Sequence, residues 1–331
     1  MKKRYGIASL TALSAIVILL NSCMSGSGFT TLDGMVWNTT YHIVYDGPEN
    51  YNDSVLSTLK DVENSVSVFR EGSTVSKVNK SKEAEVDRYF KKVYEMSREI
   101  NRKTGGMFDP TLAPLIEAWG FGRGHEATAD TLRIDSLLQT VGIYKTHLEG
   151  NRIIKDNEKI AFNFSALAKG YGVDCVAEMF MRNGIRNFLI EIGGEIRCNG
   201  RNSRGEDWCI SVDSPSQGDM NLEHVSLMQI YLSSGAVATS GNYRNFHTRG
   251  GEKYGHTISP VSGRPVKTDV VSATVTAPTT MLADALATSC MAMGSEEGMK
   301  LCDDMGCGVM LVLTDLTIVS NERFKGLQQP R

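Results

Sequence analysis

The stretch MLADALATSCMAMG, residues 281–294, is the feature that most constrains what this chain can fold into. Apolar and small residues cover nearly every face of the helix it predicts, so that helix should lie buried between other elements. Asp284 and Thr288 interrupt the pattern. At a spacing of four residues, their side chains lie on one face of the helix.

A buried carboxylate needs a compensating group, because an ionised acid alone in an apolar setting is unstable. Asp284 is therefore expected to be paired, protonated or bound to a cation. A carboxylate and a hydroxyl offer hard oxygen ligands, which suit Mg2+ or Ca2+ better than a soft metal. The competing interpretation is an aspartate that caps a neighbouring helix or pairs with a lysine. These two residues alone leave both open.

The rest of the chain predicts an α+β fold. Apolar residues spaced by 3.6 indicate amphipathic helices from about Asp53 to Phe69 and from Glu85 to Lys103, and a buried helix covers Ala166 to Met181. Thr39 to Tyr45 is typical of a strand, and later strands occur as neighbouring pairs. Such irregular alternation favours α+β packing over a doubly wound parallel sheet.

The N-terminus has the pattern of a secretory signal, with basic residues followed by an apolar run that is too short for a transmembrane span. Leu20-Asn21-Ser22-Cys23 resembles a bacterial lipobox, in which Cys23 would become the lipidated first residue. We therefore predict a signal peptide over 1–22, a lipidated cysteine and flexible tether over 23–32, and a single domain over 33–331. The alternative is an ordinary secretory signal with a coincidental cysteine.

The net charge and the cysteine spacing argue against a nucleic-acid-binding protein and against a zinc site. Removal of Lys2, Lys3 and Arg4 with the signal moves the formal charge from −3 to −6, because three cations are lost. A mildly acidic protein gives no support to a nucleic-acid partner. The remaining cysteines lack zinc-like spacing, and most are expected to be small buried hydrophobes. The sequence cannot assign disulfide bridges among these six cysteines, and Cys198 and Cys209, which flank a hairpin-like loop, are the one pair to check.

Three further stretches carry chemistry-bearing residues. In FNFSALAKGYGVD, Lys169 lies in an apolar first turn and a half of a helix, where it could meet phosphate or pair with Asp284. In GGMFDPTLAPLIEAWGFG, Pro110 keeps Asp109 out of helical geometry, so its carboxylate projects from a turn. His256 lies in a segment rich in glycine and small residues, and could be a general acid or base or a phosphate partner.

The order of these blocks is more specific than any one of them. FDPTLAPLIEAWGFG, FSALAKGYGVD, IEIGGEI, AVATSGNYR, HTISPVSGRPV and APTTMLADALATSCMAMG together resemble the FAD:protein FMN transferase family, also called ApbE, from about Asp33 to Thr314. The resemblance implies a two-lobed fold with largely antiparallel sheets. It also implies a Mg2+-dependent enzyme that cleaves FAD, releases AMP, and attaches FMN through its phosphate to a threonine or serine of an acceptor protein.

The resemblance also assigns roles to residues. Asp284 and Thr288, with the backbone carbonyl of Ala166, would be metal ligands, and His256 and Asp284 would be the catalytic residues. Contacts to the flavin nucleotide fall on eight positions: Trp37, Phe69, Asp109, Pro110, Thr111, Asn163, Lys169 and Ile258. Three residues depart from the family pattern: Trp37 and Asn38 stand where Met-Gly is usual, and Asn163 stands where aspartate is usual.

Partners and location follow from the same resemblance. The acceptor would be a redox-protein subunit, such as a subunit of a membrane redox pump, and the enzyme would lie outside the cytoplasmic membrane on a lipid anchor. Two rival functions remain at this point. One is an FAD pyrophosphatase that releases free FMN and AMP, and the other is a non-catalytic lipoprotein that binds flavin.

Overall fold

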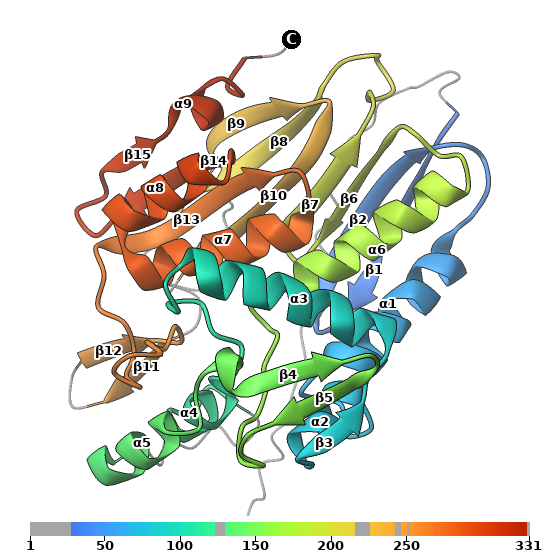
Figure 1. The fold of residues 1–331 in the computed structure, drawn as a ribbon. Helices are drawn as coiled ribbons and strands as arrows, with labels where there is room; N and C mark the ends of the chain where they lie inside the picture. Colours follow the sequence, from blue (N-terminus) through green and yellow to red (C-terminus); the bar gives the residue numbers. More distant parts are fainter. Residues whose placement is uncertain (1–27, 123–129, 216–225, 242–245, 250–251, 330–331) are drawn as a thin grey trace, which may run out of the picture.

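An eight-stranded sheet organises the molecule (Figure 1). The computed structural model describes residues 28–122, 130–215, 226–241, 246–249 and 252–329. Every ladder of this sheet is antiparallel. Its strands, in spatial order, are β1 (Phe29–Val36), β2 (Thr39–Asp46), β6 (Phe188–Ile192), β7 (Glu195–Asn199), β10 (Ser234–Gly241), β13 (Val270–Ala277), β14 (Gly308–Leu313) and β15 (Ile318–Ser320).

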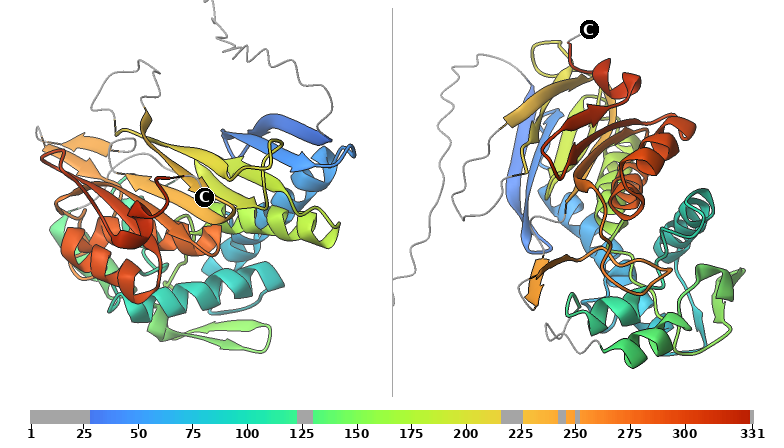
Figure 2. Two further views of the ribbon diagram at one scale, coloured as in Figure 1. Left: turned by 90° about the horizontal axis from the view of Figure 1, so that it is seen from above. Right: turned by 90° about the vertical axis from the view of Figure 1, so that its left-hand side faces the viewer.

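Helices cover one face of this sheet (Figures 1 and 2). The two central ones are α6 (Ala168–Arg182) and α7 (Thr280–Met293), which contact each other. Around them lie α1 (Asn52–Val66), α3 (Arg88–Lys103) and α8 (Ser295–Asp304). Alternation along the strands gives the reason: Val309 and Leu311 of β14 enter the core under the helices, whereas Met310 points to the other face.

The opposite face is covered by a hairpin of β8 (Trp208–Asp213) and β9 (Ser226–Leu232). Trp208, Ile210 and Ile230 of this hairpin pack with Val237 and Met310 of the main sheet. The short C-terminal helix α9 (Glu322–Lys325) adds Phe324, which is completely buried, to the same cluster. The main sheet is therefore buried on both faces along its centre.

Smaller elements gather beyond α3, below the main sheet in the view of Figure 1. They are α2 (Thr74–Asn79), β3 (Glu83–Glu85), α4 (Ala113–Ala118), α5 (Thr131–Leu138), the 3-10 turn Ile143–Lys145, β4 (Thr146–Glu149), β5 (Arg152–Lys155), β11 (Phe246–Arg249) and β12 (Glu252–Gly255). β3, β5 and β4 form an antiparallel sheet, and β11 pairs with β12. The predicted α+β fold with largely antiparallel sheets is confirmed.

Two expectations need correction at the level of the fold. β1 begins at Phe29, four residues before the expected start of the domain at Asp33, because Phe29 to Val36 pairs along its whole length with β2. Cys198 and Cys209 do not form a disulfide: both are free, with Cys198 buried in β7 and Cys209 on the exposed face of β8. The predicted signal peptide and Cys23 lie outside the described residues.

The described ranges contain helices of at most 16 residues. None of the helices there is both long and apolar enough to cross a bilayer.

Candidate active site

A cavity of about 650 Å3 lies where the start of α6, the end of β10 and the middle of α7 meet the loops around Asp109 and His256. Ten of the predicted site residues line it: Phe69, Asp109, Pro110, Asn163, Ala166, Lys169, His256, Ile258, Asp284 and Thr288. Segments distant in sequence thus converge on one space, whose size is ordinary for a small-molecule site.

Asp284 and Thr288 both line this cavity from one face of α7, as their spacing predicts. Thr279 caps the start of this helix through its side chain. Asp284 is only 5% exposed, and this burial raises the pKa of its carboxyl to about 7, although the Lys169 ammonium opposes the shift. Thr288 Oγ1 is 3.2 Å from Ser240 Oγ of β10.

The backbone of α6 approaches α7 unusually closely at this point. A Cβ on Gly170 would lie 2.5 Å from the carbonyl oxygen of Thr280, so only glycine fits there. The approach lets Gly170 N–H donate to Asp284 Oδ2 at 3.1 Å. In the other direction, Asp174 of α6 accepts from the N–H groups of Thr280 and Met281, at 2.8 and 2.9 Å. The two helices therefore exchange carboxylate contacts at their N-terminal ends.

Both interpretations of Asp284 find support in this geometry. One carboxylate oxygen accepts from the first turn of α6, as a cap of a neighbouring helix does. The side chain nevertheless faces the cavity together with Thr288 and Ala166, which is the arrangement expected of hard ligands. Among the described residues, no three His, Cys, Asp or Glu side chains cluster in a way that could hold a metal ion. A cation here would therefore have at most two ligands of these types among the described residues, and neutral oxygens would supply the others.

Lys169 forms an ion pair with Glu195, a residue that sequence analysis did not single out. Its ammonium also donates to the carbonyl of Gly193, at 3.0 Å. Glu195 opens β7 directly after the Gly193-Gly194 turn, and its side chain is only 4% exposed. The signal was present in the block IEIGGEI, where a carboxylate follows a tight turn into a buried strand.

The carboxylate of Asp109 lines the cavity but is already engaged in the fold. It accepts from Thr111 N–H at 2.8 Å, from the Thr111 hydroxyl at 2.5 Å and from Ile143 N–H at 3.0 Å. Thr111 is completely buried and is not among the residues that line the cavity, and its predicted contact with the nucleotide stays a prediction. The Thr111 hydroxyl is used internally, since it also accepts from Gly142 N–H at 2.7 Å.

Trp37 also lies outside the set of residues that line the cavity. The predicted contact of its indole with the flavin or adenine stays a prediction. Its ring packs on α6, where a Cβ on Gly172 would lie 2.3 Å from the indole. Trp37 and Asn38 form the β1–β2 turn with φ of 52° and 59°, a left-handed conformation that most side chains avoid. The turn directs the indole into the core.

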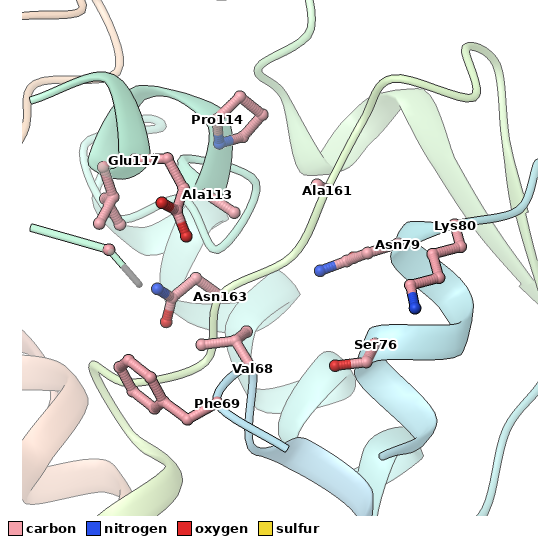
Figure 3. A pocket seen from close by; sticks show the side chains of 12 residues that line it. Val68, Phe69, Ser76, Asn79, Lys80, Ala113, Pro114, Glu117, Ala161 and Asn163 are labelled. Carbon is pink, nitrogen blue, oxygen red and sulfur yellow. The ribbon is translucent and has the colours of Figure 1, made fainter. Parts of the chain in front are cut away.

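The other residues predicted for the site form the rim and walls of the larger cavity. Phe69 is 65% exposed and stands at the border between this cavity and a smaller one of about 250 Å3 (Figure 3). Asn163 also borders both, and its side-chain oxygen accepts from Ser165 N–H at 2.8 Å. The ring of His256 is half-buried and lies 6.3 Å from that of Phe121.

Comparison with known proteins identifies the class of this fold. The chain is 35% identical to the FAD:protein FMN transferase of Vibrio cholerae, over 92% of this chain and 93% of that protein. It is 31% identical to the FAD:protein FMN transferase of Haemophilus influenzae, over 96% of both.

Solved structures of flavin transferases have a similar fold. The flavin transferase ApbE from Vibrio cholerae superposes with a TM-score of 0.79 at 32% identity, over 90% of this chain and 99% of that one. The apo form of the Pseudomonas stutzeri flavinyl transferase ApbE gives a TM-score of 0.80 at 26% identity, over 91% and 96%. The fold is therefore that of the flavin transferases. The ApbE family model matches residues 37–311, and the chain belongs to the ApbE family.

Proposed function

We infer that this chain is an FAD:protein FMN transferase whose chemistry takes place in the 650 Å3 cavity. One observation supports this site above all others. A buried carboxylate and an ammonium, Asp284 and Lys169, line the same cavity at the junction of α6 and α7. A pyrophosphate needs such a combination, because cations must compensate its charge and a carboxylate can hold one of them.

The reaction is a phosphoryl-type transfer. A threonine or serine hydroxyl of the acceptor attacks the phosphorus of the FMN half of FAD. A bond forms between that phosphorus and the hydroxyl oxygen, while the bond from phosphorus to the bridging oxygen breaks. AMP leaves with the bridging oxygen and the electron pair, and the hydroxyl loses its proton. Catalysis of this kind depends mainly on positioning and on electrostatic stabilisation.

The donor set fits a hard divalent cation, and we propose Mg2+. Asp284 and Thr288 would hold it with the backbone carbonyl of Ala166, since all three residues line the cavity and offer oxygen ligands. The Asp284 carboxylate has acceptor capacity left for a cation, because its hydrogen bond from Gly170 N–H uses only the Oδ2 atom. When bound, the cation would neutralise charge on the pyrophosphate and on the departing phosphate.

The chain's own residues would perform the other tasks. Lys169 provides a positive charge beside the phosphates, and the first turn of α6 presents the positive end of a helix dipole to the same region. His256, on the opposite loop, would take the hydroxyl proton or contact phosphate. Phe69 and Ile258 supply apolar surface for the ring system.

We also propose an extracytoplasmic location on a lipid anchor at Cys23, facing a bacterial membrane. Support comes from the N-terminal sequence, with its basic start, apolar run and cysteine placed directly behind that run. An acceptor subunit of a membrane redox complex fits this location, because both proteins would lie at the same membrane surface. Mass spectrometry of the mature protein tests the anchor: a diacylglyceryl modification on Cys23 is expected, and an unmodified cysteine would contradict it.

A transfer assay tests the function. The protein is incubated with FAD, Mg2+ and an acceptor fragment, and the intact mass of the acceptor is measured alongside AMP. We expect one FMN increment on the acceptor and an equal amount of AMP. Release of free FMN and AMP with an unchanged acceptor mass would instead identify a pyrophosphatase.

Substitution at the proposed metal site gives the first mutational prediction. Asp284→Ala should lower the transfer rate on the order of 100-fold or more, because it removes the charged ligand. The control is Glu83→Gln, which alters an exposed ion pair with Arg152 outside the cavity and should transfer at the wild-type rate. Full transfer by Asp284→Ala would refute the metal assignment.

A further inference from the structure

Glu195 is a buried carboxylate in the cavity for which neither sequence nor family resemblance supplied a role. It is the first residue of β7, and the Gly193-Gly194 turn brings it back toward the start of α6. Its Oε2 atom is paired with the ammonium of Lys169. A charge buried in this way is stable only if its ionic partner stays in place.

Lys169 is less buried than Glu195. Its side chain is 36% exposed against 4% for Glu195, and both residues line the cavity. The β6–β7 turn therefore holds the ammonium at two points, the Glu195 carboxylate and the Gly193 carbonyl at 3.0 Å. A free lysine side chain samples many rotamers, and fixing one of them costs conformational entropy. Because the β6–β7 turn orders Lys169 when the protein folds, this entropy is not lost again when the substrate binds.

The proposal rests on the proposed function. We propose that Glu195 is a positioning residue, which with the Gly193 carbonyl fixes the Lys169 ammonium on the cavity wall where the FAD phosphates bind. An oriented ammonium stabilises charge that develops on the departing AMP, whereas a mobile one must first be ordered. Glu195 itself is not required to touch the substrate. Its effect on the reaction passes through Lys169.

This assignment differs from a purely structural ion pair between the hairpin and α6. A structural pair would contribute to stability alone. A positioning pair should instead act on kcat, since aromatic and aliphatic walls formed by residues such as Phe69 and Ile258 would continue to bind the flavin. The two roles therefore predict different kinetics for a substitution that keeps the shape of the side chain.

The test is a double-mutant cycle of Glu195→Gln and Lys169→Met in the transfer assay. Glu195→Gln should lower kcat about 10-fold or more with little change in KM for FAD. In the Lys169→Met background, adding Glu195→Gln should have no further effect. Glu195→Asp keeps the charge and should retain more of kcat than Glu195→Gln, and Glu83→Gln should behave as wild type. Wild-type kcat in Glu195→Gln, or additive losses in the double variant, would overturn the proposal.

A crystal structure of Glu195→Gln gives a readout that does not depend on turnover. Lys169 Nζ should move out of hydrogen-bond distance of the Gly193 carbonyl, from which it is 3.0 Å in the wild-type protein. An unmoved ammonium would overturn the positioning role even if activity fell. Failure of the proposed function is recognised separately, because the wild-type protein would then attach no FMN to the acceptor.

Discussion

At the residue scale, buried charged side chains link the segments that form the cavity walls. Lys155, which does not line the larger cavity, is a second example. It is completely buried, and its ammonium donates to the carbonyls of Val78, Glu158 and Ile160 at 2.9, 3.0 and 2.7 Å. The lysine thus joins the end of α2 to the segment that leads to Asn163, and both border the smaller cavity.

Lys155 gives a prediction about pH. Burial lowers the pKa of its ammonium from 10.5 to about 8. Between these values the unfolded chain binds more protons than the folded one, so the contribution of Lys155 to the free energy of unfolding rises with pH in this window. The rise is at most about 3.5 kcal/mol, because the shift from 10.5 to about 8 is 2.5 pKa units and one unit corresponds to about 1.4 kcal/mol.

Urea unfolding at pH 8 and pH 10 measures this contribution. The wild-type protein should gain stability over the interval relative to Lys155→Met, which has no group to titrate at this position. The difference between the two proteins is informative because tyrosines and cysteines titrate in both. Equal changes in the two free energies would show that Lys155 does not titrate in this range.

At the element scale, the crossing of α6 and α7 determines the site. Asp284 and Lys169 reach the cavity from these two helices, and Gly170 allows the close approach that brings them together. The exchanged hydrogen bonds, from Gly170 to Asp284 and from Thr280 to Asp174, then fix the relative position of the helices. Packing and site geometry depend on the same contact.

Gly170→Ala tests this dependence. Alanine favours a helix by about 1 kcal/mol over glycine, but its Cβ would overlap the Thr280 carbonyl at 2.5 Å. We therefore expect a net loss of about 1 to 3 kcal/mol in the free energy of unfolding, together with reduced transfer activity. Gly72→Ala is the matched control, since a Cβ there meets nothing within 4 Å. A Gly170→Ala protein as stable and active as wild type would contradict the account.

Elements differ in how well the sequence predicts them. Long periodic helices such as α1 and α3 were found within a few residues of their observed ends, because many side chains repeat the same signal. The six-residue helix α2 and the three-residue strand β3 were missed, since so few residues carry no measurable period. The predicted tether overlaps the first four residues of β1, because the pairing of β1 with β2 is not visible along the chain.

At the scale of the whole molecule, the candidate site is assembled from segments that span most of the chain. Local patterns marked Asp284, Lys169 and His256 as unusual, and the order of the blocks suggested that they meet. Glu195 and the true positions of Trp37 and Thr111 required the structure, because each depends on what another segment presents to it. When a distant helix buries a side chain, the residues next to that side chain in the sequence do not indicate it.

We propose that a hard dication binds between Asp284 and Thr288 while FAD occupies the cavity. Crystals soaked with FAD and Mn2+, which stands in for Mg2+, test it through anomalous scattering. The account predicts a peak within coordination distance of the Asp284 carboxylate and the Thr288 hydroxyl, next to the pyrophosphate. Bound FAD with no peak there, and the Asp284 carboxylate paired with a lysine ammonium, would contradict it.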